Sequence, residues 1–321
     1  MIKRLAVLTS GGDAPGMNAA IRAVVRKGIH HGFEVFGVDR GYAGVLNGEF
    51  SLLNSHSVAG IIQHGGTMLK TARSEAFKTE EGFALAVKNI QEHYIDYLIV
   101  IGGDGSMAGA VKLTAAGIPT IVIPATIDND MPGTEYTIGF DTALNTVLDA
   151  ANKIRDTAES HERVAVIEVM GRSAGHIALM AGLACGAEVI LLPEKALDMA
   201  AVCEGLKRSH ARGKLYSIVM VAEGVAKGYD VASQIKENTG FNPNITVLGY
   251  IQRGGNPSAH DNIIASRMGA AAIDCILENN ANCLIALQKS EIVAVPYEQT
   301  TEYKRGIDLS LYETAGILSV S

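Results

Sequence analysis

The sequence lacks tryptophan and contains few cysteines and no excess of basic residues. The four cysteines, at positions 185, 203, 275 and 283, follow no CxxC or other ligand-like spacing. They therefore indicate reduced thiols in a cytoplasmic protein rather than a disulfide framework. Lys and Arg number 27 against 34 Asp and Glu, which gives a net charge of −7. Because nucleic acids and anionic membranes attract basic surfaces, we expect neither as a partner.

Long apolar segments are also absent. The longest uncharged runs, near 113–127 and 173–187, contain Gly, Pro or His. They fall short of the roughly 18 continuous apolar residues that suggest a membrane helix. The opening residues MIKRLAVLTSGGD contain too few apolar residues before Gly11 for a secretory signal. We expect no membrane segment.

The composition is that of a fully folded globular protein. Hydrophobic residues make up 48% and charged residues 19% of a chain of 321 residues. At about 100–200 residues per domain, this length predicts two domains.

The most informative stretch is TIVIPATIDND, residues 120–130. Its uncharged first part predicts a buried strand over 120–125, followed by Thr126, Asp128 and Asp130. Ligands bind at the carboxyl ends of strands in open parallel sheets, and carboxylates there suit a general base or a metal-side group. An Asx-rich turn with no catalytic role is the alternative.

Two glycine-rich segments also follow predicted strands and precede predicted helices. The first, SGGDAPG at 10–16, follows an apolar strand at 5–8, and the second, GGDGS at 102–106, follows a strand at 97–101. Such loops direct backbone N–H groups and a helix N-terminus at phosphate, and Asp104 is suited to a metal-bound polyphosphate. The first is not a Walker A loop, because no GK[ST] follows Gly16.

Strands and helices alternate along the rest of the chain. We expect helices at 58–66, 80–93, 141–160, 174–185, 199–210 and 258–277, and strands that include 163–169, 216–221 and 245–251. This order predicts an α/β fold of two doubly wound, Rossmann-like parallel-sheet domains, with the active site in the cleft between them.

Eight motifs in order resemble those of the bacterial ATP-dependent 6-phosphofructokinases: SGGDAPGMNAAIR, GGDGS, TIDND, IGFDTA, IRDTAESH, EVMGR, AEG and LGYIQRGG. The resemblance runs from Ile2 to about Gly269. It implies transfer of the γ-phosphate of ATP, with Mg²⁺, to the 1-hydroxyl of fructose 6-phosphate by a homotetramer. It further implies a larger ATP-binding domain, 1–139 plus 252–303, and a smaller sugar-phosphate domain, 140–251 plus 304–321.

The resemblance also implies roles for individual residues. Asp128 is the expected base, with Thr126 and Arg172 as further catalytic residues, and Asp104 is the expected Mg²⁺ ligand. The implied nucleotide contacts are Gly12, Arg73, Ser74, Gly103, Asp104, Gly105 and Ser106. The implied sugar-phosphate contacts are Thr126, Ile127, Asp128, Arg163, Met170, Gly171, Arg172, Glu223, Asn244, Tyr250, Ile251, Gln252 and Arg253, with Arg163 reaching across a subunit interface.

Departures from the family pattern occur in two regions. Asn244 and Tyr250 replace an Arg and a His of the sugar-phosphate site, so we expect weaker binding of fructose 6-phosphate. An effector site for ADP or phosphoenolpyruvate is implied by Arg22, Arg26, Arg155, Glu188, Arg212 and Lys214. Ser55, His56 and Gly60 replace the Arg, Tyr and Asp of well-known members there, so we expect weak regulation.

Two other functions remain open from the sequence. A pyrophosphate-dependent or other phosphoketose kinase would share the fold, but the small Gly105 and Ala125 leave room for ATP and add no charge to exclude it. A non-catalytic sugar-phosphate or nucleotide sensor would have no need to keep Asp104, Asp128 and Arg172 together.

Overall fold

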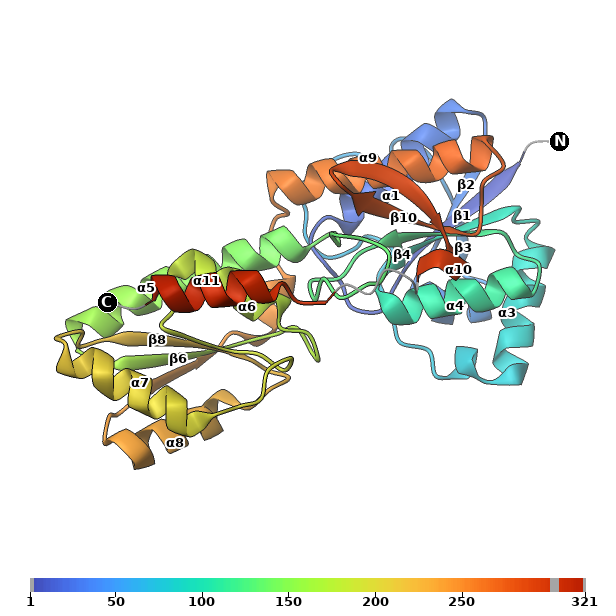
Figure 1. Ribbon diagram of the computed structural model, residues 1–321. Coiled ribbons are helices and arrows are strands. Elements are labelled where there is room, and N and C mark those ends of the chain that lie inside the picture. The colour runs from blue at the N-terminus through green and yellow to red at the C-terminus, as the bar shows by residue number, and fades with distance from the viewer. Residues whose placement is uncertain (1–2, 301–305, 320–321) are drawn as a thin grey trace. The chain divides into compact units, whose positions relative to one another are not determined.

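The computed structural model describes residues 3–300 and 306–319. Within them the chain forms two compact units (Figure 1). Unit 1 contains residues 3–126, 130–142 and 253–300, and unit 2 contains residues 127–129, 143–252 and 306–319. The predicted boundary at 303/304 lies outside the described residues.

Unit 1 is built on a seven-stranded sheet with the order β11-β10-β5-β4-β1-β2-β3. Its strands are β1 (Arg4–Ser10), β2 (Glu34–Val38), β3 (Phe50–Leu53), β4 (Tyr97–Gly102), β5 (Thr120–Pro124), β10 (Cys283–Gln288) and β11 (Glu291–Pro296). The five inner strands are parallel, whereas β3 and β11 pair antiparallel with their neighbours. The α/β prediction is therefore confirmed, with an antiparallel strand added at each edge.

Helices cover both faces of this sheet (Figure 1). They are α1 (Met17–His30), α2 (Gly41–Asn47), η1 (Ala76–Lys78), α3 (Glu80–Glu92), α4 (Asp104–Ala115), α9 (Ala259–Leu277) and α10 (Tyr297–Thr300). α1 and α9 pack together on one face, and α2, α3 and α4 contribute to the core of the other. Because side chains alternate along a strand, Leu98 and Val100 of β4 join that second core with Met107 and Leu113 of α4.

Unit 2 is built on a smaller, fully parallel sheet with the order β7-β8-β6-β9. Its elements are α5 (Phe140–Ser160), which begins in unit 1, β6 (Val164–Val169), α6 (His176–Cys185), β7 (Val189–Leu191), α7 (Met199–Ala211), β8 (Ser217–Ala222), α8 (Gly228–Thr239), β9 (Asn244–Val247), η2 (Gly249–Arg253) and α11 (Leu309–Leu318). α7 and α8 share a core with the sheet, while α6 and α11 pack together on its opposite face (Figure 1).

Two predicted elements were wrong. Residues 58–66 form turns rather than a helix. Gly60 and Gly66 have φ values of 69° and 67°, and the Asn18 amide donates to the carbonyl oxygens of His64 and Gly65 at 3.0 and 3.3 Å. The predicted strand at 245–251 ends at Val247, because Gly249 has a φ of 52° and begins η2.

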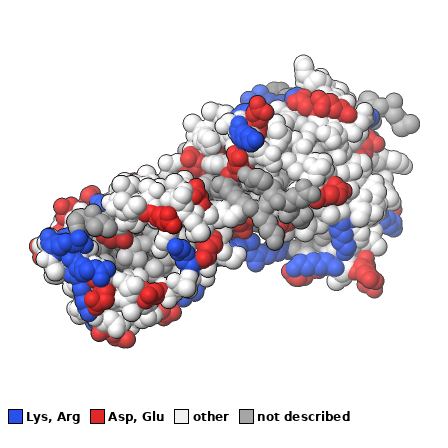
Figure 2. All heavy atoms as spheres, in the orientation of Figure 1, with Lys and Arg blue, Asp and Glu red and all other residues white. Residues whose placement is uncertain are grey.

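Acidic and basic side chains are interspersed over both units on the face shown in Figure 2. Neither described range, 3–300 or 306–319, contains a helix long and apolar enough to cross a membrane.

Candidate active site

The loops of unit 1 that carry predicted nucleotide contacts begin at one edge of its sheet. β1, β4 and β5 are parallel neighbours, with Ser10 opposite Gly102 and Gly102 opposite Pro124. The segments that follow these three strands therefore leave the sheet at the same carboxyl edge, where ligands bind in folds of this kind.

Close backbone packing holds these loops together. The Ala125 N–H donates to the Gly102 carbonyl at 2.9 Å, and a Cβ on Gly102 would lie 2.5 Å from the Ser10 carbonyl oxygen. The Thr71 hydroxyl donates to the Gly11 carbonyl at 2.8 Å. This bond ties the segment that carries Arg73 and Ser74 to the first glycine loop.

The second glycine loop opens helix α4. Asp104 is exposed in the first turn, where the helix dipole favours a negative charge or a bound phosphate. A Cβ added to Gly105 would meet no atom within 4 Å. The packing around this position therefore does not require glycine, and open space adjoins it. Ser106 is buried, and its carbonyl accepts a hydrogen bond from the Tyr42 hydroxyl at 2.7 Å.

Thr126 and Arg253 also lie in this part of unit 1. The Thr137 hydroxyl donates to the Thr126 carbonyl at 2.6 Å. A Cβ on Gly12 would lie 3.4 Å from the guanidinium carbon of Arg253. A predicted nucleotide contact and a predicted sugar-phosphate contact are therefore neighbours.

In unit 2 the central feature is an ion pair between Asp128 and Arg172. The distance from Arg172 Nε to Asp128 Oδ2 is 3.4 Å, and the Asp128 side chain is 3% exposed while that of Arg172 is 54% exposed. A buried carboxylate needs a compensating partner, and here that partner also extends into solvent. Next to Asp128, Ile127 is buried.

The backbone at Arg172 is fixed in an unusual conformation. Arg172 has a φ of 52°, and its N–H donates to Glu223 Oε1 at 2.9 Å. Gly171 has a φ of 135°, and a Cβ there would lie 2.4 Å from the Ala174 carbonyl oxygen. Left-handed conformations of non-glycine residues cost about 1–3 kcal/mol and occur at functional sites.

Gln252 joins this group from η2. It is fully buried and accepts from the Met170 N–H at 3.2 Å while donating to the Gly249 carbonyl at 3.0 Å. The neighbouring Tyr250 and Ile251 are 78% and 58% exposed. Unit 2 thus brings together Asp128, Met170, Gly171, Arg172, Glu223 and Gln252.

Arg163 and Asn244 lie at the opposite edge of the same sheet. Arg163 precedes β6, and Met170 follows it. β6 has 6 residues, and a rise of about 3.3 Å per residue separates its two ends by roughly 20 Å. Within one chain, Arg163 is therefore not brought to Arg172.

The predicted effector residues are divided between the units. Arg22 and Arg26 are on α1 of unit 1, whereas Arg155, Glu188, Arg212 and Lys214 belong to unit 2. Glu188 pairs with Lys214 and accepts from the Ile218 N–H, and Arg155 donates to the Cys185 carbonyl.

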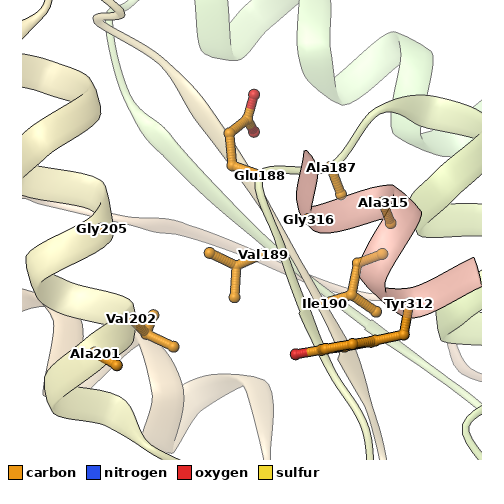
Figure 3. Close-up of a pocket in the computed structure, with 10 residues that line it drawn as sticks. All are labelled: Ala187, Glu188, Val189, Ile190, Ala201, Val202, Gly205, Tyr312, Ala315 and Gly316. Carbon is orange, nitrogen blue, oxygen red and sulfur yellow. The ribbon is translucent and has the colours of Figure 1, made fainter. Parts of the chain in front are cut away.

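A pocket of about 270 Å³ adjoins Glu188, between β7, α7 and α11 (Figure 3). In Figure 3 the Glu188 carboxylate points away from the side chains of Val189 and Val202, and the ring of Tyr312 forms another wall. The interior of this pocket is largely apolar, so it does not itself resemble a phosphate site.

The sequence did not reveal two residues that hold these loops. Thr71 and Thr137 bond the backbone of Gly11 and Thr126. Thr71 lies two residues before the predicted contact Arg73, but nothing in the local pattern indicates a partner 60 residues away.

The first unit has glycine loops at the carboxyl edge of a mostly parallel sheet, and the second has an aspartate–arginine pair beside a parallel sheet. These features are typical of an α/β protein that binds phosphate groups. The chain belongs to the phosphofructokinase family. The model of that family, described as "Phosphofructokinase", matches residues 4–276.

Similar proteins extend this result over the whole chain. The chain is 54% identical over 319 residues to a protein of Brevibacillus brevis named ATP-dependent 6-phosphofructokinase, covering 99% of this chain and 100% of that protein. A Bacillus subtilis protein of the same name is 52% identical with the same coverage. Among solved structures, phosphofructokinase from Saccharomyces cerevisiae has a TM-score of 0.88 and 35% identity, covering 99% of this chain and 48% of the yeast chain.

Proposed function

We propose that this chain catalyses a step of glycolysis, the transfer of the γ-phosphate of ATP to the 1-hydroxyl of fructose 6-phosphate. The products are ADP and fructose 1,6-bisphosphate. Identities of 54% and 52% to proteins named for this activity support the proposal. The observation that carries it is the buried Asp128 carboxylate paired with the partly exposed Arg172 at 3.4 Å.

Asp128 has the chemistry of a general base in this reaction. It accepts the proton of the 1-hydroxyl while the oxygen bonds the γ-phosphorus, and the bond from that phosphorus to the bridging oxygen breaks with its electrons left on ADP. Positioning and charge neutralisation supply most of the catalysis in phosphoryl transfer. Arg172 supplies a positive charge beside the base, and we assign it to the transferring phosphoryl group.

We assign the nucleotide phosphates to Gly12, Arg73, Ser74 and the 103–106 loop, whose backbone and helix terminus favour anions. The residues at α4 fit Mg²⁺, because Asp104 is an exposed carboxylate between glycines. Among the described residues no cluster of three or more His, Cys, Asp or Glu side chains is arranged to hold a metal. Mg²⁺ usually binds one or two carboxylates together with substrate phosphates, which is why we assign it to Asp104. When bound, Mg²⁺ neutralises phosphate charge.

We assign the sugar phosphate to Arg163, Met170, Gly171, Glu223, Tyr250, Ile251, Gln252 and Arg253, together with Thr126, Ile127 and Arg172. Asn244 lies beside this group, bonded to Arg163. Since Arg163 lies roughly 20 Å of strand from Met170, we assign it to the sugar site of a second copy in a homotetramer. We also propose a cytoplasmic location, which accords with four cysteines at no disulfide-like or ligand-like spacing.

The test is a coupled assay of the full chain with ATP or pyrophosphate against a panel of phosphorylated sugars. We expect Mg²⁺-dependent turnover with ATP and fructose 6-phosphate. Faster turnover with pyrophosphate would reverse the donor assignment, and preference for another phosphosugar would reverse the substrate assignment.

We further propose ADP or phosphoenolpyruvate as a weak effector at Arg22, Arg26, Arg155, Glu188, Arg212 and Lys214. The exposed Ser55 and Gly60 supply neither an arginine donor nor a carboxylate. Allosteric coupling is typically 1–3 kcal/mol, and a site without these partners belongs at the low end. We expect either compound to shift half-saturation by fructose 6-phosphate by less than about tenfold. A larger shift in steady-state titrations would contradict this.

A further inference from the structure

Arg163 and Asn244 are joined by a hydrogen bond at the edge of the unit 2 sheet where its strands begin. Arg163 Nη1 donates to Asn244 Oδ1 at 3.3 Å. The two strands that carry them are parallel neighbours, with Asn244 opposite Ala165. Both side chains are exposed, so this contact acts at a surface that a ligand or a second copy can reach.

We propose that Asn244 is a positioning residue that orients the Arg163 guanidinium for the phosphate of the sugar substrate. This inference rests on the proposed function and on the role it gives Arg163. It assigns Asn244 an action through Arg163 in place of direct phosphate binding.

The backbone of Arg163 is fixed, whereas its side chain has freedom to move. The Arg163 N–H donates to the Ala158 carbonyl at 3.0 Å, and the Arg163 carbonyl accepts from Ser217 at 3.3 Å. A long side chain loses up to about 1.5–2 kcal/mol of rotamer entropy when it becomes ordered. A bond that orders it before the ligand arrives lowers the cost of binding.

The chemistry of the acceptor suits this task. An amide oxygen is neutral, so it fixes the direction of the guanidinium without cancelling its charge. Among the described residues Arg163 has no carboxylate within 4.0 Å of its guanidinium nitrogens. The charge therefore remains available to an anion.

A second acceptor for the guanidinium lies nearby. Arg163 and Glu162 both line a pocket of about 220 Å³, together with His210 and Phe241. Loss of the bond to Asn244 would leave the guanidinium free to turn toward the Glu162 carboxylate.

The experiment is a double-mutant cycle in the full-length enzyme. Asn244→Ala and Arg163→Ala are made separately and together, and KM for fructose 6-phosphate and kcat are measured for each. Asn244→Leu keeps the size of the side chain but has no acceptor oxygen. Asn238→Ala alters an exposed asparagine of the same unit that bonds the Gln234 carbonyl on α8, and it serves as the matched control.

We expect Asn244→Ala and Asn244→Leu to raise KM for fructose 6-phosphate about 2-fold to 12-fold, the effect of one hydrogen bond. Because the bond acts on substrate binding, kcat should change little. In the Arg163→Ala background the same substitutions should have no further effect, since residues that act through one another are non-additive. Asn238→Ala should leave KM unchanged.

Equal effects of Asn244→Ala in both backgrounds, or an unchanged KM in the parent background, would overturn the inference. If Arg163→Ala itself leaves KM unchanged, the proposed role of Arg163 fails instead.

A readout independent of turnover distinguishes these cases. In NMR, the Arg163 side-chain N–H, assigned with Arg163→Lys, should reorient slowly in the parent and faster in Asn244→Leu. Equal motion in both would overturn the positioning role whatever the substrate is.

Discussion

Asp128 is a carboxylate that the fold buries almost completely, with its side chain 3% exposed and Arg172 at 3.4 Å. If it accepts the proton of the sugar hydroxyl, Asp128→Asn should lower kcat by about 10²- to 10⁴-fold. The amide has nearly the same shape, so thermal unfolding and KM for fructose 6-phosphate should change little. Steady-state kinetics of the purified variant measure this effect.

The control for this substitution is Asp149→Asn, which alters an exposed carboxylate on α5 that pairs with Lys153. Exposed pairs of this kind contribute at most about 1 kcal/mol to stability, and kcat should stay at the parent value. A kcat for Asp128→Asn within a few-fold of the parent would remove Asp128 from the mechanism.

Gly105 provides a test of donor choice that does not disturb packing. Because a Cβ there meets no atom within 4 Å, Gly105→Asp should fold normally. Two like charges about 4 Å apart repel by about 1 kcal/mol in water and about 4 kcal/mol near a protein surface. We therefore expect kcat/KM for ATP to fall by roughly 5-fold to several hundred-fold.

Gly105→Asn separates the charge from the size of the new side chain, and it should retain most of the activity with ATP. Equal losses in the Asp and Asn variants would show that space, rather than charge, limits ATP at this position.

At the level of single residues, the sequence predicted what depends on neighbours along the chain. The buried β5 and the carboxylates after it follow from the run TIVIPATIDND. The fixed conformation of Arg172 depends on Glu223, which is 51 residues away. No local pattern reveals such a contact.

The same distinction holds for helices and strands. The bounds of α3 agree with the prediction to within one residue, because its apolar residues recur at helical spacing. Those of β4 agree equally well, because its apolar run is short and continuous. Residues 58–66 contain apolar positions that resemble a helix, but the side chain of Asn18, more than 40 residues earlier, holds their carbonyl groups in turns. A contact between distant segments overrides the local preference there.

Asp261 links the first turn of α9 to the first turn of α5, and the sequence did not indicate it. It is fully buried, and its carboxylate accepts from the Gly139 N–H at 2.9 Å and the Thr142 N–H at 2.8 Å. Asp261→Asn replaces one acceptor oxygen by a donor group that faces these N–H groups. We expect a loss of at least about 1.5–3 kcal/mol in the free energy of unfolding at neutral pH, measured by chemical denaturation.

The pH dependence of that loss has a defined sign. Burial raises the pKa of Asp261 above 3.8, although hydrogen bonds from Thr142 and Gly139 oppose the shift. Between 3.8 and the raised pKa, the unfolded chain releases the proton while the folded chain retains it. The carboxyl group therefore stabilises the fold most below its unfolded pKa and less as pH rises through its folded pKa. As pH rises through this window, the difference in free energy of unfolding between the parent and Asp261→Asn should shrink. A difference that grows with rising pH would mean that the folded-state pKa of Asp261 is lowered.

At the scale of the whole molecule, the α/β class follows from the order of strands and helices, but the assembly of the site does not. Alternation along the chain predicts parallel sheets because each crossover needs a helix. Each unit nevertheless contains separate segments of the chain. Which segments join which unit depends on tertiary contacts.

The position of Arg163 makes a prediction about the assembled protein. Within a chain, β6 separates Arg163 from Met170 and Arg172 by roughly 20 Å. Under the role proposed for Arg163, the Asp128 and Arg163 that serve one substrate therefore come from different copies. Asp128→Asn and Arg163→Ala oligomers, dissociated together and reassembled, should therefore form some sites with both residues intact. Activity at low fructose 6-phosphate should rise above the sum of the two separate preparations.

The matched control mixes Asp128→Asn with Glu223→Ala. Glu223 bonds the backbone of Arg172, which pairs with Asp128 in the same unit, so no reassembled site regains both residues and activity should not recover. Recovery in the control as well, or in neither mixture, would place Arg163 outside the shared sugar-phosphate site.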